Sequence, residues 1–460
     1  MDARNITVPE QELSEFVAAA SYEAIPGEAI RVVKNILLAV FGTTIAGAAE
    51  DGCAALRDLA LQQGGTPEAT VLIYGDRLPA GQAALLNGVM ARALDYCDAM
   101  APGLHIGSSL LPATLAAVEL RGGCDGREFV AALAAGAEIG SRMNLTESMY
   151  DGFDPTGIAG VFASTAAVCR VLRLSERETH QALALAFNRA GGSFQSNVDG
   201  SLAVRLIQGW VAESGVTCAR LAKAGLTGPE RFFSGVYGYR HLFGRDRLAA
   251  DSVSGLLGER WALLGTMFKK YPSCGLTQGV TGLTLQALSE FPFAPEELAE
   301  FKIILPPYGY RLVGHEFRLG DNPRVDAQFS AQYCVANAIV RRSSALSHFR
   351  PDAIAEPRIL DLIPRIRCLA DEALDARGHT AVDIHIELTD GRRRSLSLDH
   401  PLGFPERPLA QADHQQRFAD CLSYADGRIG ADRAESLLRM IDQIETQADV
   451  RQLIPLTMST

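Results

Sequence analysis

The sequence lacks several features that would assign a function at once. Its nine cysteines are scattered singly, with no C-x-x-C pair and no spacing typical of a zinc ligand set or a disulfide framework. It has no run of Lys and Arg, and the 54 Asp and Glu outnumber the 43 Lys and Arg to give a net charge of −11. That balance argues against nucleic acid as the main partner. We therefore expect reduced core thiols, no metal site and no nucleic-acid partner.

Long apolar runs are missing as well. The two longest, residues 36–49 and 129–139, are interrupted by Gly, Thr or Glu and fall short of the ~20 residues that a bilayer span needs. Residues 1–10 are polar and acidic, without the basic segment and apolar run of a secretory signal. These absences predict buried helices, no membrane partner and a cytoplasmic location.

The chain does have enough length and apolar content for two or more hydrophobic cores, at 460 residues and 47% hydrophobic. Between about residue 10 and residue 288 the pattern is helical almost throughout. Apolar residues recur at three- and four-residue spacing in segments 82–99, 125–143, 157–172 and 176–190. Ser175 followed by Glu178 is a capping-box pattern. We expect this region to be all-helical.

The pattern changes after Pro292. Residues 381–388 and 392–398 alternate apolar and polar side chains on either side of Asp390-Gly391, which predicts a β-hairpin. A strand is also expected at residues 301–305, and helices at 327–341 and 354–368. This part is predicted to be a small α+β domain.

The tail, residues 409–450, is helical again and is expected to pack back on the first region. The predicted fold is therefore mainly α: a large discontinuous all-helical domain made of residues 1–270 and 405–460, and a smaller α+β domain of residues 271–404.

Asp95, Asp98 and His105 form the first cluster that can carry chemistry. If the helix of residues 82–99 continues, the two carboxylates share a face, and a Pro-Gly turn brings the histidine near its end. A carboxylate can hold and polarise an imidazole for proton transfer. The alternative is two exposed acids and a surface histidine, although acids at a helix C-terminus oppose the helix dipole. The other eight histidines are expected to be solvated.

The second cluster is the Gly- and Pro-rich loop of residues 150–157. Asp154 or Thr156 can cap the apolar helix that follows, and the free N–H groups of a helix start can also bind a carboxylate. Arg205, inside an apolar stretch, can bind an anion or form a structural ion pair with an acid.

The third cluster is the loop of residues 266–275, which contains Lys269, Lys270 and Tyr271. It lies near the junction of the two predicted domains, where clefts are common. The alternative is two solvated lysines. Because the chain has no glycine-rich phosphate motif and no nucleophile elbow, these clusters permit a cofactor-independent proton-transfer enzyme without requiring one.

At these clusters the chain resembles the MmgE/PrpD family, which includes 2-methylcitrate dehydratase, cis-aconitate decarboxylase and iminodisuccinate epimerase. Four ordered segments resemble family motifs: residues 94–105 (L-D-[FY]-[DC]-D and a later His), 152–157 (G-[WF]-H-P-T-G), 269–274 (K-x-Y-P-[SC]-C) and 327–333 (A-Q-F-S-x-x-Y). The resemblance implies a discontinuous helical domain, an α+β lid domain closing over a cleft, a homodimer and no organic cofactor.

Position by position, the resemblance assigns the active-site aspartate to Asp95, the histidine to His105 and the catalytic-loop lysine to Lys269. Four positions depart from the family pattern, and the first is Ile106, which follows His105 where a proline is usual. Asp154 stands where a histidine is usual, Ala99 where a threonine or serine is common, and Arg205 lies in a region where members often carry a lysine.

Together these inferences predict a lyase acting on a small di- or tricarboxylate. Lys269 and Arg205 would neutralise carboxylates and stabilise enediolate charge, and His105, oriented by Asp95, would move the proton. Asp154, Thr156, Lys270 and Tyr271 are expected to bind substrate. The resemblance favours a 2-methylcitrate dehydratase-like hydro-lyase. The alternatives are a cis-aconitate-type decarboxylase, an iminodisuccinate-type epimerase and an inactive carboxylate-binding family member.

Overall fold

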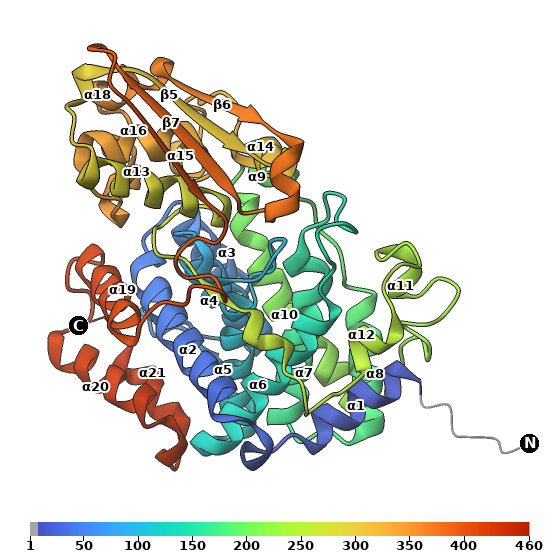
Figure 1. The fold of residues 1–460 in the computed structure, drawn as a ribbon. Coiled ribbons are helices and arrows are strands. Elements are labelled where there is room, and N and C mark those ends of the chain that lie inside the picture. The colour runs from blue at the N-terminus through green and yellow to red at the C-terminus, as the bar shows by residue number, and fades with distance from the viewer. Residues whose placement is uncertain (1–7, 460) are drawn as a thin grey trace, which may run out of the picture.

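The computed structural model describes residues 8–459, and the expectation of no leader segment falls mostly on residues outside that range. The chain is mainly helical, as predicted (Figure 1). The helices of its first half are α1 (Pro9–Ala19), α2 (Gly27–Gly47), α3 (Cys53–Gln63), α4 (Ala80–Arg92), α5 (Gly107–Arg121), α6 (Gly126–Met143), α7 (Val161–Val171), α8 (Glu176–Phe187), α9 (Gln195–Val198), α10 (Ala203–Lys223), α11 (Tyr239–Leu242) and α12 (Ala250–Ser254).

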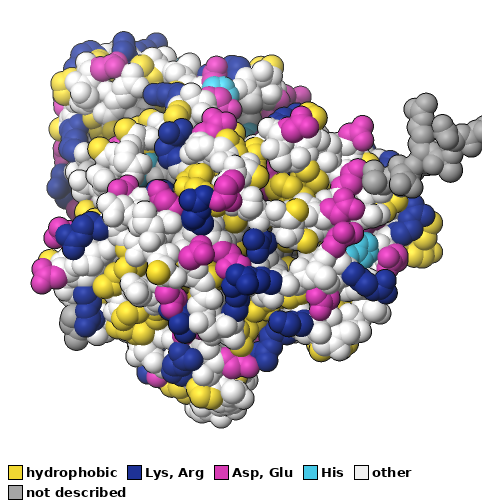
Figure 2. All heavy atoms as spheres, turned by 90° about the horizontal axis from the view of Figure 1, so that it is seen from below, with side chains coloured by type: hydrophobic (Ala, Val, Ile, Leu, Met, Phe, Trp, Pro, Cys, Tyr) yellow, Lys and Arg dark blue, Asp and Glu magenta, His cyan; other side chains and the backbone are white. Residues whose placement is uncertain are grey.

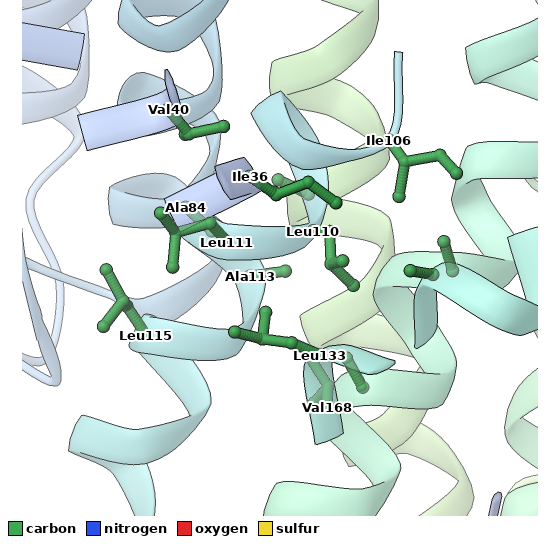
Figure 3. Packing of buried hydrophobic residues seen from close by; sticks show 14 of the residues in the cluster. Ile36, Val40, Ala84, Ile106, Leu110, Leu111, Ala113, Leu115, Leu133 and Val168 are labelled. Atoms are coloured by element: carbon green, nitrogen blue, oxygen red, sulfur yellow. The ribbon is translucent and has the colours of Figure 1, made fainter. Parts of the chain in front are cut away.

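These helices pack around a core of aliphatic side chains and small residues. Figure 3 shows Ile36 of α2, Leu110 of α5 and Leu133 of α6 within this core. Helices α6 and α7 approach closely at Gly136, where an added Cβ would lie 2.6 Å from the carbonyl oxygen of Ala163. The Ala- and Gly-rich helix faces therefore serve close helix packing.

Helix α2 contains the first of the two apolar runs. With 21 residues it is long and apolar enough to cross a bilayer by length and composition, but 78% of its most apolar stretch is buried inside the protein. The second run lies in the buried part of α6. Both apolar runs are buried helices, as predicted.

The strands are β1 (Ala69–Thr70), β2 (Arg77–Leu78), β3 (Asp98–Ala99), β4 (Met267–Phe268), β5 (Leu298–Leu305), β6 (Ile366–Ala370), β7 (Val382–Leu388) and β8 (Arg393–Leu398). The last four form one sheet in the order β6-β5-β7-β8, in which β5 and β6 are parallel and the other pairs antiparallel. The predicted hairpin is confirmed, with Glu387 opposite Arg393 beside its turn.

Helices cover one face of this sheet (Figure 1). They are α13 (Gln278–Glu290), α14 (Pro307–Val313), α15 (Pro323–Gln328), α16 (Ala331–Arg341), α17 (Pro351–Ile354) and α18 (Pro357–Leu360). Apolar residues of α13, α16, β5 and β7 form a second hydrophobic cluster within residues 280–388.

Two predicted helices are wrong in part. The helix expected over residues 354–368 consists of short helical turns followed by strand β6, because Pro357 and Pro364 interrupt the helical hydrogen bonds. The helix expected over residues 82–99 ends at Arg92, and Asp95 adopts a left-handed conformation with φ of 48°. Asp95 and Asp98 therefore do not share a helix face.

The C-terminal helices α19 (Gln411–Tyr424), α20 (Ala431–Asp442) and α21 (Leu453–Leu456) return to the first half of the chain, where Figure 1 shows them beside α2. Phe418 of α19 packs against α2, 3.1 Å from the position of a Cβ added at Gly42. The larger hydrophobic cluster accordingly contains residues from 13–268 and from 409–454. The exact domain limits, residues 270 and 404, stay a prediction.

Charged side chains of both signs are mixed over the face shown in Figure 2. Elsewhere in the described chain too, charges of opposite sign pair, as in Lys34 with Glu445 and Arg57 with Asp76. On this face, therefore, the excess of acidic residues does not form a single patch.

Candidate active site

A short strand pair brings two of the predicted clusters together. Strand β3 begins three residues after Asp95, and strand β4 ends directly before Lys269. The two strands are antiparallel, with Asp98 opposite Phe268 and Ala99 opposite Met267. Segments 170 residues apart in the sequence thus lie side by side, and Lys269 lies next to Asp95.

The carboxylate of Asp95 is buried between two cations. Lys269 Nζ lies 2.5 Å from Asp95 Oδ1 and donates a second hydrogen bond, of 3.1 Å, to the Asp95 carbonyl oxygen, and Arg92 pairs with the same Oδ1. Burial raises the pKa of Asp95, but the charges of Arg92 and Lys269 more than offset this, and the pKa lies below its ordinary value. Asp95 is therefore ionised at neutral pH.

The ring of His105 is held in one tautomer. Its Nδ1–H donates to the carbonyl oxygen of Asp98 at 2.9 Å, which leaves Nε2 as the unprotonated nitrogen. Arg92 Nη2 lies 3.4 Å from Nε2. Burial and the charges of Arg92 and Lys269 hold the pKa of His105 well below its ordinary value. His105 is thus a neutral base, and the group that orients its ring is the Asp98 carbonyl rather than the predicted Asp95 carboxylate.

Asp95, His105 and Lys269 line one cavity, which is partly open to solvent. Its other walls come from two distant parts of the chain: Phe194 and Met267 belong to the helical part, and Leu312 and Phe329 to residues 271–404. A largely apolar cavity with a few converging polar groups is typical of a small-molecule site.

Three polar residues at this site were not predicted from the sequence. Arg92 contacts both Asp95 and His105. The side-chain oxygen of Asn197 is buried at the cavity without a hydrogen-bond partner. His379 lines the cavity, and its Nδ1 lies 2.7 Å from Glu147. No sequence signal marks Asn197, whose side-chain oxygen has no partner, or His379, whose partner Glu147 is distant in the chain. The expectation of eight solvated histidines is also wrong for His414, which is buried against Phe268.

Asp154 and Thr156 lie behind the cavity wall. The carboxylate of Asp154 accepts hydrogen bonds from the backbone N–H groups of Thr156 and Gly157, at 2.8 and 3.2 Å, so that it caps the helical turn leading into α7. Burial raises the pKa of Asp154 to about 6. Thr156 Oγ1 accepts a 2.9 Å hydrogen bond from the backbone N–H of His105 and so positions that residue.

The other expected substrate-binding residues contact groups outside the cavity. Arg205 is buried and donates to the backbone carbonyl of Asp51 at 2.8 Å, and Lys270 pairs with Asp413 of α19 at 2.6 Å. Tyr271 donates its backbone N–H to Gln278. None of the three lines the cavity with Asp95.

The nine cysteines are free, and seven of them are buried. Within residues 8–459, no group of three or more His, Cys, Asp or Glu side chains is arranged to hold a metal ion.

Comparisons with known proteins cover most of the chain. Residues 11–250 match the MmgE/PrpD N-terminal domain, and residues 271–445 match the MmgE/PrpD C-terminal domain. A cis-aconitate decarboxylase-like protein of Aspergillus oryzae is 26% identical over 97% of this chain and 96% of its own length. The cis-aconitate decarboxylase of Homo sapiens is 23% identical over 83% of this chain and 80% of its own length, and that of Aspergillus terreus is 25% identical over 73% of each.

Proposed function

Because the chain belongs to the MmgE/PrpD family and is a lyase of that family, we propose that it breaks a bond in a small di- or tricarboxylate bound in the cavity of Asp95, His105 and Lys269. The observation that carries the proposal is the convergence of these three side chains on one cavity. The relatives named cis-aconitate decarboxylase favour decarboxylation as the reaction.

In a decarboxylation, the carboxyl group leaves as CO2 and its bonding electrons remain on the substrate carbon, which must then receive a proton. Lys269 and Arg92 place positive charge where the carbanion and its neighbouring carboxylate develop negative charge. His105 is the proton donor in this scheme. A bound carboxylate beside Nε2 raises the pKa of the ring, so that the complex takes up the proton that His105 later delivers.

Dehydration is the second candidate, and the neutral state of His105 favours it. With Nδ1–H bonded to the Asp98 carbonyl, Nε2 is free to accept a proton from the carbon next to a carboxylate. The hydroxyl group then takes this proton from the ring and departs as water. The expected 2-methylcitrate dehydratase-like activity belongs to this candidate, although the named relatives favour the first.

We also propose that residues 271–404 form a lid domain over the cavity, and that the protein is a cytoplasmic homodimer. The lid is supported by the cavity walls that this part supplies, such as Leu312 and His379. Light scattering on the purified chain tests the dimer.

The test of the reaction is product NMR in deuterated water. The purified chain is incubated with cis-aconitate, 2-methylcitrate and iminodisuccinate in separate samples. We expect loss of CO2 or water from one of them, with solvent deuterium in the decarboxylation product or in recovered hydroxy acid. Ligands that raise the melting temperature but show neither product nor deuterium would contradict the proposal and indicate a carboxylate-binding protein without chemistry.

A further inference from the structure

The charges at the cavity are few. Of the residues that line it in the described chain, Asp95 and Lys269 are the charged pair, and they neutralise each other. Arg92 pairs with Asp95 but does not line the cavity itself, and it adds one positive charge, whereas His105 is neutral. The buried end of the cavity therefore offers at most one net positive charge to a ligand.

The two other cations expected to bind substrate, Arg205 and Lys270, are occupied elsewhere. Arg205 donates to the Asp51 carbonyl, and Lys270 pairs with Asp413. A tricarboxylate in the cavity would keep about two of its three negative charges uncompensated, and burying an uncompensated carboxylate costs several kcal/mol. A dicarboxylate meets this limit more closely, with Lys269 for one carboxylate and a single further negative charge to accommodate.

The remaining walls are mainly apolar. Their apolar side chains are Met100, Phe194, Met267, Leu312, Phe329 and Phe404, Ala99 has no hydroxyl group, and the hydroxyl of Thr380 donates to the Asp399 carbonyl at 2.9 Å. Ala99, Met267 and Phe404 also form a small hydrophobic cluster of their own. Such walls stabilise a hydrocarbon group by about 0.8 kcal/mol for each buried CH2, whereas they offer no hydrogen bond to a third carboxylate.

We propose that the substrate of this site is a dicarboxylate that carries an alkyl substituent, in the position where a tricarboxylate such as cis-aconitate has its third carboxylate. The inference rests on the proposed function only in taking this cavity as the substrate site. It concerns binding, and it holds for either of the two candidate reactions.

The test is isothermal titration calorimetry of the full chain with three unreactive ligands. Tricarballylate has three carboxylates, 2-ethylsuccinate is the same skeleton with one carboxylate replaced by a methyl group, and 2-pentylsuccinate extends that chain by three CH2 groups. We expect 2-ethylsuccinate to bind at least about tenfold more tightly than tricarballylate, and each added CH2 to tighten binding by about fourfold. Equal or tighter binding of tricarballylate, or no binding of any of the three, overturns the inference.

A pair of variants tests whether the apolar wall sets this preference. Leu312→Lys adds a cation at a half-buried position of the cavity wall, and Leu319→Lys adds one at a leucine that is 45% exposed and does not line the cavity. We expect Leu312→Lys to tighten tricarballylate binding about tenfold and weaken 2-pentylsuccinate binding, and Leu319→Lys to change neither. An unchanged ligand preference in Leu312→Lys counts against the inference.

The two proposals fail separately. Turnover of cis-aconitate together with tighter binding of tricarballylate than of 2-ethylsuccinate would leave the lyase function standing and refute the alkyl dicarboxylate. Preferential binding of 2-pentylsuccinate, without turnover of any dicarboxylate or tricarboxylate, would support the ligand class and contradict the lyase function.

Discussion

At the scale of single residues, Asp95 holds the site together because it is the buried partner of both Lys269 and Arg92. Lys269→Met leaves Asp95 with Arg92, whereas Asp95→Asn leaves two buried cations without a carboxylate. We expect Asp95→Asn to lower the free energy of unfolding by about 3–5 kcal/mol and Lys269→Met by less. Urea denaturation at pH 7 measures both.

The same two variants are expected to lower kcat by about a hundredfold or more, because each removes charge from the reacting centre. Lys270→Met is the matched control, since Lys270 pairs with Asp413 near the surface. Full activity in Lys269→Met would contradict the assigned role.

Asp154 is expected to make the stability of the protein depend on pH. Its pKa is raised from an ordinary value of 3.8 to about 6 by burial, so the folded protein binds this proton more tightly than the unfolded chain. The associated stability is complete below pH 4 and is lost as the pH rises through 6. Asp154→Asn keeps an oxygen that can cap the helical turn but cannot ionise.

We therefore expect Asp154→Asn to be more stable than the natural protein at pH 7.5, by up to about 3 kcal/mol, and equally stable near pH 4. Urea denaturation between pH 4 and 8 measures the difference. A difference that does not change with pH would show that Asp154 is not the titrating group.

The sequence predicted the three central side chains and missed their surroundings. Asp95, His105 and Lys269 could be chosen because their motifs resemble a family, whereas the left-handed conformation of Asp95 was not predicted. Arg92 looks like an ordinary basic residue in a last helical turn. His379 could not be chosen, because its partner Glu147 is 232 residues away and only the folded chain brings them together.

At the scale of elements, the start of α5 fixes the distance between His105 and the rest of the site. A Cβ added at Gly107 would lie 2.3 Å from Asp98 Oδ1 and 2.7 Å from a side-chain carbon of Ile36. We expect Gly107→Ala to push α5 away from α2, to destabilise the protein by about 1–3 kcal/mol and to lower kcat. Chemical denaturation and steady-state kinetics measure the two effects.

Gly27→Ala is the control for this prediction. Gly27 also begins a long helix, α2, but an added Cβ there meets nothing within 4 Å. Equal stability losses in the two variants would mean that the close contact at Gly107 is unimportant.

Helices and strands could be predicted from the sequence where their signals lie close together in the chain. The capping box of Ser175 and Glu178 is local in sequence, and the structure has it at the start of α8. Strand β6, in contrast, depends on a distant segment of the chain. Its five residues have no alternating burial, and the strand forms because it pairs with β5, more than 60 residues earlier. The four- and three-residue spacing of Ile359, Ile363 and Ile366 therefore imitated a helix.

At the scale of the whole molecule, the cavity is closed by contacts between the helical part and residues 271–404. Tyr308 Oη donates to the carbonyl oxygen of Pro102 at 2.8 Å, and its ring packs edge-on against Tyr150 at 5.5 Å. We expect Tyr308→Phe to raise KM about threefold to tenfold, because it removes this hydrogen bond while keeping the ring. Steady-state kinetics measure the change.

Tyr310→Phe, on the same helix α14, is the control, since Tyr310 is 36% exposed. If both variants had the natural KM, the Tyr308 contact would not contribute to closure of the cavity.

The overall division of the chain was open to prediction because composition changes along it: Ala-rich helical segments give way to alternating strands near residue 300, and helices return near residue 410. The way in which the helical part and residues 271–404 share one cavity could not be predicted. It depends on the pairing of β3 with β4, two strands of two residues each, which are too short to leave a pattern in the sequence.

The most direct test of the central claim is the rate of product formation by the His105→Asn variant, beside the natural protein and His385→Asn. His385 lies on β7, bonded to Ser395, outside the cavity, and controls for the loss of a histidine. The account predicts that His105→Asn stays folded, still binds the carboxylate ligand and loses at least about a hundredfold in kcat, whereas His385→Asn keeps full activity. Product formation by His105→Asn at the natural rate would contradict the account.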